Sequence, residues 1–235
     1  MSTFSQLFPP APTFTESALP DLSGRVYLIT GSTSGVGLEL AKMLFGRNAT
    51  VYVAGRSKTS SSTAISQIKA AYPSSTGHLK PVVVDLSQLS SVRAAAEAFA
   101  AAEPRLDVLF LNAGVMTPPA GSKTADGYDL ELGTNCLGPF LLARLLQPTL
   151  EATAARADGS SVRIVWVSSM ISVGTPEGGV QFDAEGNPVQ LKAMDNYMQS
   201  KAGDLFLAHV FSQRLASRHV MSVVGTPFSS RRTLR

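Results

Sequence analysis

The sequence predicts an α/β fold, a doubly wound parallel sheet with helices on both faces. Three observations lead to this prediction. Short runs of β-branched and other apolar residues alternate with longer amphipathic stretches along most of the chain. These runs are apolar almost throughout, as expected of strands that helices cover on both faces. The chain also has 235 residues, 44% of them hydrophobic, which suffices for one substantial core.

The expected elements follow one another in a regular order. Strands are expected at residues 25–30, 49–55, 79–86, 106–114, 161–169 and 220–224. Helices are expected at residues 37–47, 61–72, 90–102, 130–155 and 196–218. The interval between Ser169 and Tyr197 is polar and rich in Gly and Pro. It is expected to be either a substrate-facing flap or a surface insertion that takes no part in catalysis.

The start of the chain differs from this pattern. Pro9, Pro10 and Pro12, interleaved with Ser and Thr, disfavour both helix and strand. We therefore expect residues 1–23 to form an extended arm and residues 24–235 to form a single folded domain. The first residues lack the basic flank and long apolar core of a secretory signal, and no run is long enough to span a bilayer.

Composition gives no support for a nucleic-acid partner or a metal site. The formal net charge is +3, 16% of residues are charged, and the basic residues are scattered, despite a pI near 9.1. The densest basic stretch, SSRRTLR at 229–235, is expected to be a solvated tail. A lone cysteine, Cys136, excludes an internal disulfide and is expected to be a small core residue. We expect a soluble, cytoplasmic protein.

The stretch LITGSTSGVGLEL, residues 28–40, places three glycines between an expected strand and an expected helix. Backbone N–H groups at a helix start favour anions, so a pyrophosphate fits this position in a Rossmann fold. Gly31 would permit the tight turn, Gly35 the approach of the phosphates, and Gly37 the packing of helix on strand. A flexible loop is the alternative, and the spacing differs from the commoner Gly-x-Gly-x-x-Gly pattern. The remaining expected cofactor-binding residues of this loop are Ser32, Thr33, Ser34 and Val36.

Arg56 follows the second expected strand, where a side chain can select between dinucleotides. An acidic residue there would pair with the ribose 2′-hydroxyl of NAD, whereas a base suits the 2′-phosphate of NADP. Arg56 therefore favours NADP (NADPH) over NAD, with Ser57 and Lys58 as possible helpers; an exposed loop arginine is the alternative.

Two later strand ends contribute further candidates for binding the cofactor. Asp85 would contact the adenine edge or cap the following helix. Asn112, Ala113 and Gly114 end the fourth expected strand, at the carboxyl edge of the sheet where this fold places its ligand. Their alternative is an ordinary Asn/Gly turn.

A second set of residues points to proton transfer. In YMQSK, Tyr197 and Lys201 lie one helical turn apart and so on one face, where the ammonium stabilises a phenolate. Ser169 ends an expected strand and can hold an oxygen that develops charge; Ser168 is the alternative, because successive strand residues face opposite sides. Asn135 lies inside an expected helix, either as a cap or solvent-facing residue or as an anchor behind the tyrosine and lysine.

Several of these motifs follow one another along the chain: TGSTSGVG, NAG, Asn135, the serine pair and YMQSK. In this order they resemble the short-chain dehydrogenase/reductase superfamily, over about residues 24–224. GYDLELGTNCLGPFLL and the long interval before Tyr197 are most similar to the retinol dehydrogenase-like branch and its fungal relatives, several of which act in secondary metabolism. The resemblance implies NADP-linked hydride transfer between an alcohol and a ketone or aldehyde, with Tyr197 donating or accepting the hydroxyl proton. It also implies that Lys201 binds the nicotinamide ribose and favours the phenolate. Ser169 would hold the substrate oxygen, and Asn135 would support a water relay.

The C-terminal residues depart from the family pattern. Family members follow the last helix and strand with a Pro-Gly turn, a Thr, a mobile substrate lid and a last edge strand. This chain reads VMSVVGTPFSSRRTLR, with Gly225, Thr226 and Pro227 in another order. We therefore expect a truncated C-terminus without the last edge strand, and weakened catalysis.

Three functions follow for comparison. The first is an NADP-dependent oxidoreductase acting on a small alcohol or carbonyl compound. The second is a catalytically impaired cofactor-binding or interaction protein, whose open sheet edge would favour association with a partner or a second copy. The third is a non-redox isomerase or lyase on the same scaffold.

Overall fold

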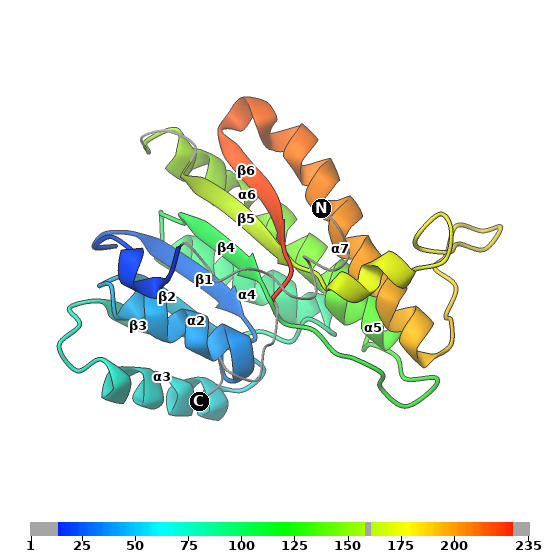
Figure 1. Ribbon diagram of the computed structural model, residues 1–235, viewed down its shortest axis with the longest axis horizontal. Helices are drawn as coiled ribbons and strands as arrows, with labels where there is room; N and C mark the ends of the chain where they lie inside the picture. The colour runs from blue at the N-terminus through cyan, green and yellow to red at the C-terminus, as the bar shows by residue number, and fades with distance from the viewer. Residues whose placement is uncertain (1–13, 158–160, 228–235) are drawn as a thin grey trace.

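The computed structural model describes residues 14–157 and 161–227. One parallel sheet of six strands lies at its centre, in the order β3-β2-β1-β4-β5-β6 (Figure 1). The strands are β1 (Val26–Thr30), β2 (Thr50–Gly55), β3 (His78–Val83), β4 (Val108–Leu111), β5 (Val162–Val167) and β6 (Val220–Gly225). The direction of winding reverses between β1 and β4, and such folds bind ligands in the crevice at that point. The predicted doubly wound parallel sheet is confirmed.

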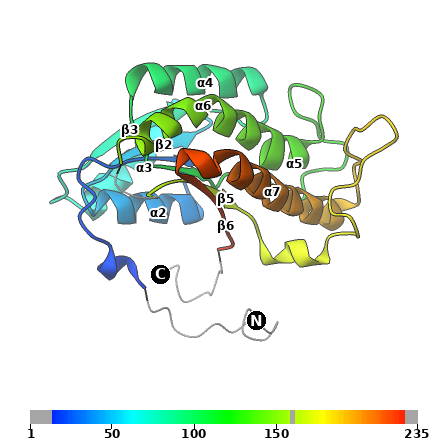
Figure 2. The ribbon, with the colours of Figure 1, turned by 90° about the horizontal axis from the view of Figure 1, so that it is seen from above.

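Helices cover the sheet on both sides (Figures 1 and 2). On one face lie α2 (Gly35–Phe45) and α3 (Lys58–Ala71), and on the other lie α4 (Leu89–Ala102), α6 (Gly138–Ala154) and α7 (Ala193–Leu215). Shorter helical turns are η1 (Glu16–Ala18), α5 (Leu130–Leu132), η2 (Gly133–Leu137), η3 (Met170–Gly174) and η4 (Ala216–Arg218). In the described residues, no helix has both the length and the apolar character that crossing a bilayer requires.

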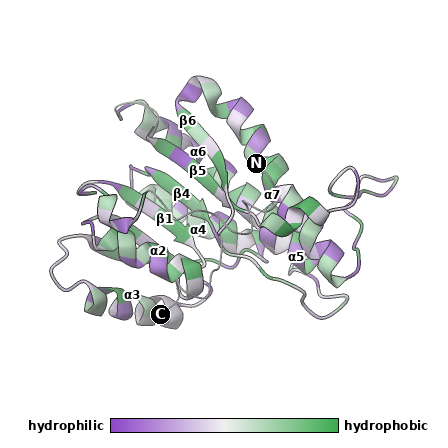
Figure 3. Ribbon diagram, in the orientation of Figure 1, coloured by the Kyte–Doolittle hydropathy of each residue, from purple (hydrophilic) through white to green (hydrophobic). Residues whose placement is uncertain are grey.

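Each central strand contributes to two hydrophobic cores, because successive side chains point to opposite faces of a sheet. Leu28 of β1 packs with Trp166 and Phe211 on the side of α4, α6 and α7. Its neighbour Ile29 packs with Ile68 of α3 on the other side. The central strands are accordingly apolar along their length, whereas the helices alternate between polar and apolar stripes (Figure 3).

The edge strand β6 is less completely covered. Val220 and Val224 pack on the core that contains Trp166. Met221 and Val223 point to the opposite face and are 36% and 37% exposed. In the part of the chain that the structure describes, β6 is the last strand of this side of the sheet.

Two expected elements differ in detail. The helix expected over 130–155 is interrupted by the wide π turn η2, which carries Asn135; such turns are frequent at functional sites. The interval after Ser169 begins with η3 and is fastened to α7, where Gln199 accepts from the Gln181 N–H and donates to the Val189 carbonyl. Among the described residues, none between Ser169 and Tyr197 lines the two cavities discussed below, which favours a surface insertion.

The expectations for the two ends of the chain are tested only in part, because the first and last residues lie outside the described ranges. Of the expected arm, η1 is held by Arg47, whose guanidinium donates to the carbonyls of Glu16 and Ser17. Residues 1–13, at the start of the arm, lie outside the described residues. Residues 228–235 also lie outside the described residues. The expected solvated tail and the expected absence of a last edge strand concern these residues and stay predictions.

Candidate active site

The loop between β1 and α2 is shaped by its glycines. Gly31 has φ +66°, and an added Cβ would lie 2.9 Å from the Ala113 Cα. Gly37 is buried where a Cβ would lie 2.5 Å from the Gly31 carbonyl oxygen and 2.6 Å from Asn112 Nδ2. Gly35 has φ +56° and open space beside it. The expected roles of a tight turn, an open approach and close helix packing are therefore consistent with the geometry at these three positions.

The loop presents a helix start without a side-chain cap. Ser34 is the N-cap of α2, and its hydroxyl accepts no capping hydrogen bond. The first N–H groups of a helix have no partner within the helix, so those of α2 remain available to an anion.

Ser32 does not fit the predicted binding role. It is fully buried, its hydroxyl donates to the Ile29 carbonyl at 2.8 Å, and its Oγ accepts from the Ala54 N–H at 2.9 Å. These bonds point its side chain into the protein, away from the cavity. Ser32 therefore fastens the loop to β2.

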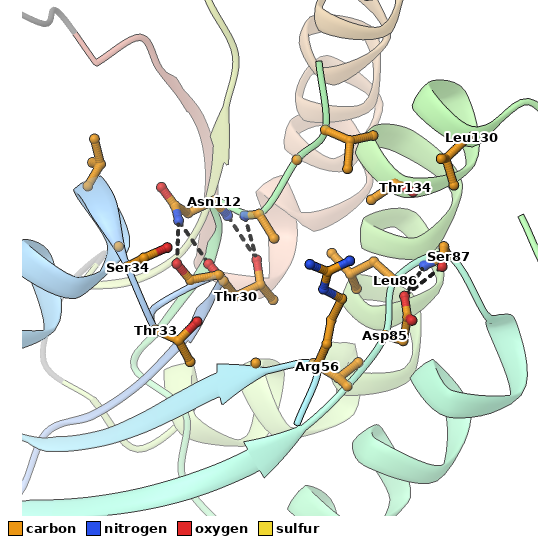
Figure 4. A pocket seen from close by; sticks show the side chains of 18 residues that line it. Thr30, Thr33, Ser34, Arg56, Asp85, Leu86, Ser87, Asn112, Leu130 and Thr134 are labelled. Atoms are coloured by element: carbon orange, nitrogen blue, oxygen red, sulfur yellow. Dashed lines mark hydrogen bonds between the residues drawn. The ribbon is translucent and has the colours of Figure 1, made fainter. Parts of the chain in front are cut away.

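A cavity of about 420 Å³ lies over the carboxyl ends of β1, β2 and β4 (Figure 4). Arg56 projects from the end of β2 into this cavity, between Thr33 and Asp85 (Figure 4). Arg56 is exposed, and among the described residues no carboxylate pairs with its guanidinium. The predicted cofactor residues that line this cavity are Gly31, Thr33, Ser34, Val36, Gly37, Arg56, Asp85, Asn112, Ala113 and Gly114.

Two of the residues weighed for this cavity have local structural partners. Asp85 accepts from the backbone N–H and the hydroxyl of Ser87, at 2.9 and 2.6 Å, and so fixes the turn after β3 rather than the start of α4. Ser57 caps α3 by accepting from the Ser60 N–H. The Ser57 side chain is therefore occupied at the helix start, while Arg56 beside it faces the cavity.

The ends of β1 and β4 are joined by reciprocal hydrogen bonds. Thr30 Oγ1 accepts from the N–H groups of Asn112 and Ala113, at 2.9 and 3.0 Å. Asn112 Nδ2 donates to the Thr30 carbonyl at 2.9 Å (Figure 4). Asn112 therefore positions the glycine loop. Sequence reasoning missed Thr30, since a threonine at a strand end carries no distinctive signal.

A second cavity, of about 290 Å³, adjoins the first. Val36, Asn112, Gly114 and Val115 line both cavities, so the two form one continuous crevice. Ser168, Ser169, Tyr197 and Lys201 line the second one. The structure thus brings the predicted catalytic serine, tyrosine and lysine to one place, next to the glycine loop.

The two candidate serines differ in their hydrogen bonds. Ser168 is buried, and its hydroxyl donates to the Lys201 carbonyl at 2.7 Å. Among the described residues, Ser169 Oγ accepts one bond, a long one of 3.4 Å from the Ile171 N–H. The hydroxyl hydrogen of Ser169 therefore remains available to a ligand, and this geometry favours Ser169 over Ser168.

Asn135 holds three segments together. Its side-chain oxygen accepts from the Val115 N–H at 2.8 Å, and its Nδ2 donates to the Val115 carbonyl and to Ser200 Oγ, both at 2.9 Å. These bonds connect the end of β4 to α7 beside Lys201. The position supports the predicted anchor, whereas the water relay stays a prediction.

Lys201 is fixed at the floor of the second cavity. Its ammonium donates to the Val167 carbonyl at 2.9 Å and to Asp204 Oδ2 at 3.0 Å, and it lies 5.9 Å from the centre of the Tyr197 ring. Burial raises the pKa of Asp204 to about 6, although Lys201 acts in the opposite direction. Sequence reasoning missed Asp204; its charge three residues after Lys201 on the same helix was the available signal.

Known proteins resemble this chain over most of its length. The family model for short chain dehydrogenases matches residues 25–184. A short-chain dehydrogenase/reductase of Phomopsis amygdali is 45% identical over 95% of this chain and 66% of its own length. The short-chain dehydrogenase/reductase pkfC of Emericella nidulans is 43% identical over 86% of this chain and 65% of its own length. The chain thus spans about two thirds of the length of these relatives.

Solved structures show the same arrangement. A Mycobacterium paratuberculosis protein is 30% identical with a TM-score of 0.71, over 94% of this chain and 74% of its own. A metagenomic short-chain oxidoreductase in complex with NADP is 28% identical with a TM-score of 0.66, over 90% of this chain and 85% of its own. Together with the strand order and the glycine loop, these matches show that the chain belongs to the short-chain dehydrogenase/reductase superfamily of oxidoreductases.

Proposed function

We propose that this chain is an NADP-dependent oxidoreductase that interconverts an alcohol and a ketone or aldehyde. The observation that carries the proposal is the crevice formed by the two adjoining cavities. One cavity has the glycine loop and Arg56, and the other has Ser169, Tyr197 and Lys201. Because these two relatives come from fungi, we include a role in fungal secondary metabolism in the proposal.

The residues of the first cavity fit a phosphorylated dinucleotide. The helix start after Ser34 and the open space at Gly35 suit a pyrophosphate. Arg56 offers a planar cation to a phosphate group. Among the described residues no carboxylate forms an ion pair with it, and the neighbouring Asp85 accepts from Ser87 instead. We therefore assign the 2′-phosphate of NADP to Arg56. When bound, the dinucleotide would supply the hydride for carbonyl reduction and accept it in alcohol oxidation.

The residues of the second cavity supply position and proton transfer. Ser169 donates a hydrogen bond to the substrate oxygen, which holds the reacting carbon in place. Tyr197 Oη gives its proton to that oxygen during carbonyl reduction and accepts it during alcohol oxidation. The Lys201 ammonium stabilises the phenolate form of Tyr197, and Asn135 keeps the end of β4 against α7.

The lining of the second cavity favours a substrate with an apolar body. Its apolar side chains are those of Val36, Val115, Met116, Val167 and Pro227. Burial of apolar surface against such side chains contributes to binding, while the hydroxyl groups fix the orientation.

Two measurements on the purified chain test this function. Saturating NADP should raise the melting temperature by several degrees and NAD by less, because a ligand that binds only the folded state stabilises it by mass action. Arg56→Glu should remove the difference. With NADPH and a panel of ketones and aldehydes, we expect one NADPH to be consumed for each alcohol formed. Failure to bind either dinucleotide, or product formation without NADPH consumption, would refute the proposal.

A further inference from the structure

We propose that Asp204 is a positioning residue that holds the Lys201 ammonium beside Tyr197 and offsets its charge, so that the buried pair sets the pH at which Tyr197 loses its proton. The inference rests on the proposed roles of Tyr197 and Lys201 and deepens them.

Two hydrogen-bond acceptors hold the Lys201 ammonium in place. Asp204 follows Lys201 by three residues on α7, so both side chains lie on one face of the helix. Asp204 Oδ2 and the Val167 carbonyl oxygen accept from Lys201 Nζ at 3.0 and 2.9 Å. An ammonium has three N–H donors. Two are committed to these partners, and one remains for the cavity that Lys201 lines.

Because Lys201 and Asp204 are both buried, the charge of Asp204 acts strongly on the Lys201 ammonium. The side chains of Lys201 and Asp204 are 6% and 4% exposed. Solvent screening is weak at such sites, so a carboxylate at 3.0 Å offsets much of the field of the ammonium. The raised pKa of Asp204, about 6, means that this offset is present above that pH and fades below it.

The other titratable groups at this junction do not replace Asp204. Burial raises the pKa of the Cys136 thiol on η2, which keeps the thiol neutral. Asp129, which precedes α5, accepts instead from the Leu132 N–H and from Asn196 Nδ2. Of the described residues, Asp204 is the one whose carboxylate pairs directly with Lys201.

The consequence concerns the Tyr197 hydroxyl. An ammonium paired with a carboxylate stabilises a nearby phenolate less than an unpaired ammonium does. Asp204→Asn keeps an oxygen acceptor of the same size and removes the charge. It should therefore make the phenolate of Tyr197 form at lower pH.

The test follows phenolate absorbance during a pH titration of the full chain, without dinucleotide or substrate. The contribution of Tyr197 is isolated by subtracting the titration of the matching Tyr197→Phe variant. In Asp204→Asn we expect its midpoint to fall by about one pH unit, while Asp204→Glu stays close to the wild type. The control is Glu39→Gln, which breaks the half-exposed i,i+3 pair Glu39–Lys42 on α2, outside the two cavities, and should leave the midpoint unchanged. An unchanged midpoint in Asp204→Asn would overturn the proposal.

Asp204→Asn leaves a buried ammonium without its counter-charge, so its folding is part of the test. If this variant does not fold, the double variant Lys201→Met with Asp204→Asn shows whether the unpaired ammonium is the cause. Folding of the double variant supports an obligatory coupling between the two charges. Its failure to fold as well would show that Asp204 serves the packing of α7, and the proposal would be wrong.

The titration is separable from the proposed function. It needs no turnover, so a chain that reduces no carbonyl compound can still show the midpoint shift. If the chain is active, the pH profile of kcat/KM gives a second readout. The limb that reports the tyrosine should move in Asp204→Asn in the same direction as the phenolate midpoint.

Discussion

Replacing Gly37 by alanine tests the reasoning about the glycine loop most sharply, because two physical effects oppose each other. Inside a helix, Gly→Ala ordinarily stabilises by about 0.5–1 kcal/mol. At Gly37 the new Cβ would lie 2.5 Å from the Gly31 carbonyl oxygen and 2.6 Å from Asn112 Nδ2. The Gly31 oxygen belongs to a left-handed turn, and Asn112 is bonded to the Thr30 carbonyl, so neither can move without reshaping the loop.

Overpacking of this kind costs about 1–3 kcal/mol, so the net effect of Gly37→Ala is a destabilisation of about 1–2 kcal/mol. For a chain of this length the melting temperature should fall by roughly 2–8 °C. Because the displaced atoms form the loop, the affinity for NADP should also fall. The Kd should rise about tenfold for each 1.4 kcal/mol of binding free energy that is lost. Urea unfolding gives the free energy, and calorimetric titration gives the affinity. A variant as stable as the wild type, or more stable, with unchanged affinity would refute the close approach at Gly37.

Other variants and conditions separate structural from functional roles. Gly35→Ala and Gly186→Ala both place an L side chain at positive φ with open space beside it, so each should lose about 1 kcal/mol in urea unfolding, yet only Gly35→Ala should weaken NADP binding. Ser168→Ala removes a buried bond to the Lys201 carbonyl and should cost about 1 kcal/mol of stability, whereas Ser169→Ala should keep stability and lose kcat. Folding raises the pKa of Asp204 from 3.8 to about 6, so the folded state binds that proton more tightly and stability should fall as pH rises between these values. The fall amounts to about 3 kcal/mol and should be absent in Asp204→Asn; equal pH dependence of the two urea-unfolding curves would contradict it.

The sequence predicts the fold well because its signals are local and repeated. Each buried strand, such as β1 and β2, is a continuous apolar run, and each amphipathic helix between two runs adds a crossover that keeps the strands parallel. The alternation of Leu28 and Ile29 between the two cores follows directly from the period of a strand.

Details of the site depend on contacts between distant segments. Ser32 has the same residue type as Ser34, but its hydroxyl turns inward because it donates to the Ile29 carbonyl and accepts from the Ala54 N–H of β2, which returns beside the loop. The preference for Ser169 over Ser168 comes from α7, more than twenty residues later in the chain, because the Lys201 carbonyl on that helix occupies the Ser168 hydroxyl. The π turn at Asn135 has no propensity signal, because tertiary packing against α7 and the end of β4 selects it.

We propose that Tyr197 transfers the proton in the crevice that it shares with the dinucleotide. The most direct measurement is the single-turnover rate of NADPH oxidation by a carbonyl substrate in the wild type and in Tyr197→Phe. We expect the variant to keep its NADP affinity and its melting temperature while the rate falls by about 10²–10⁴-fold. Equal rates in the two proteins would contradict the assignment of Tyr197 as the acid and base.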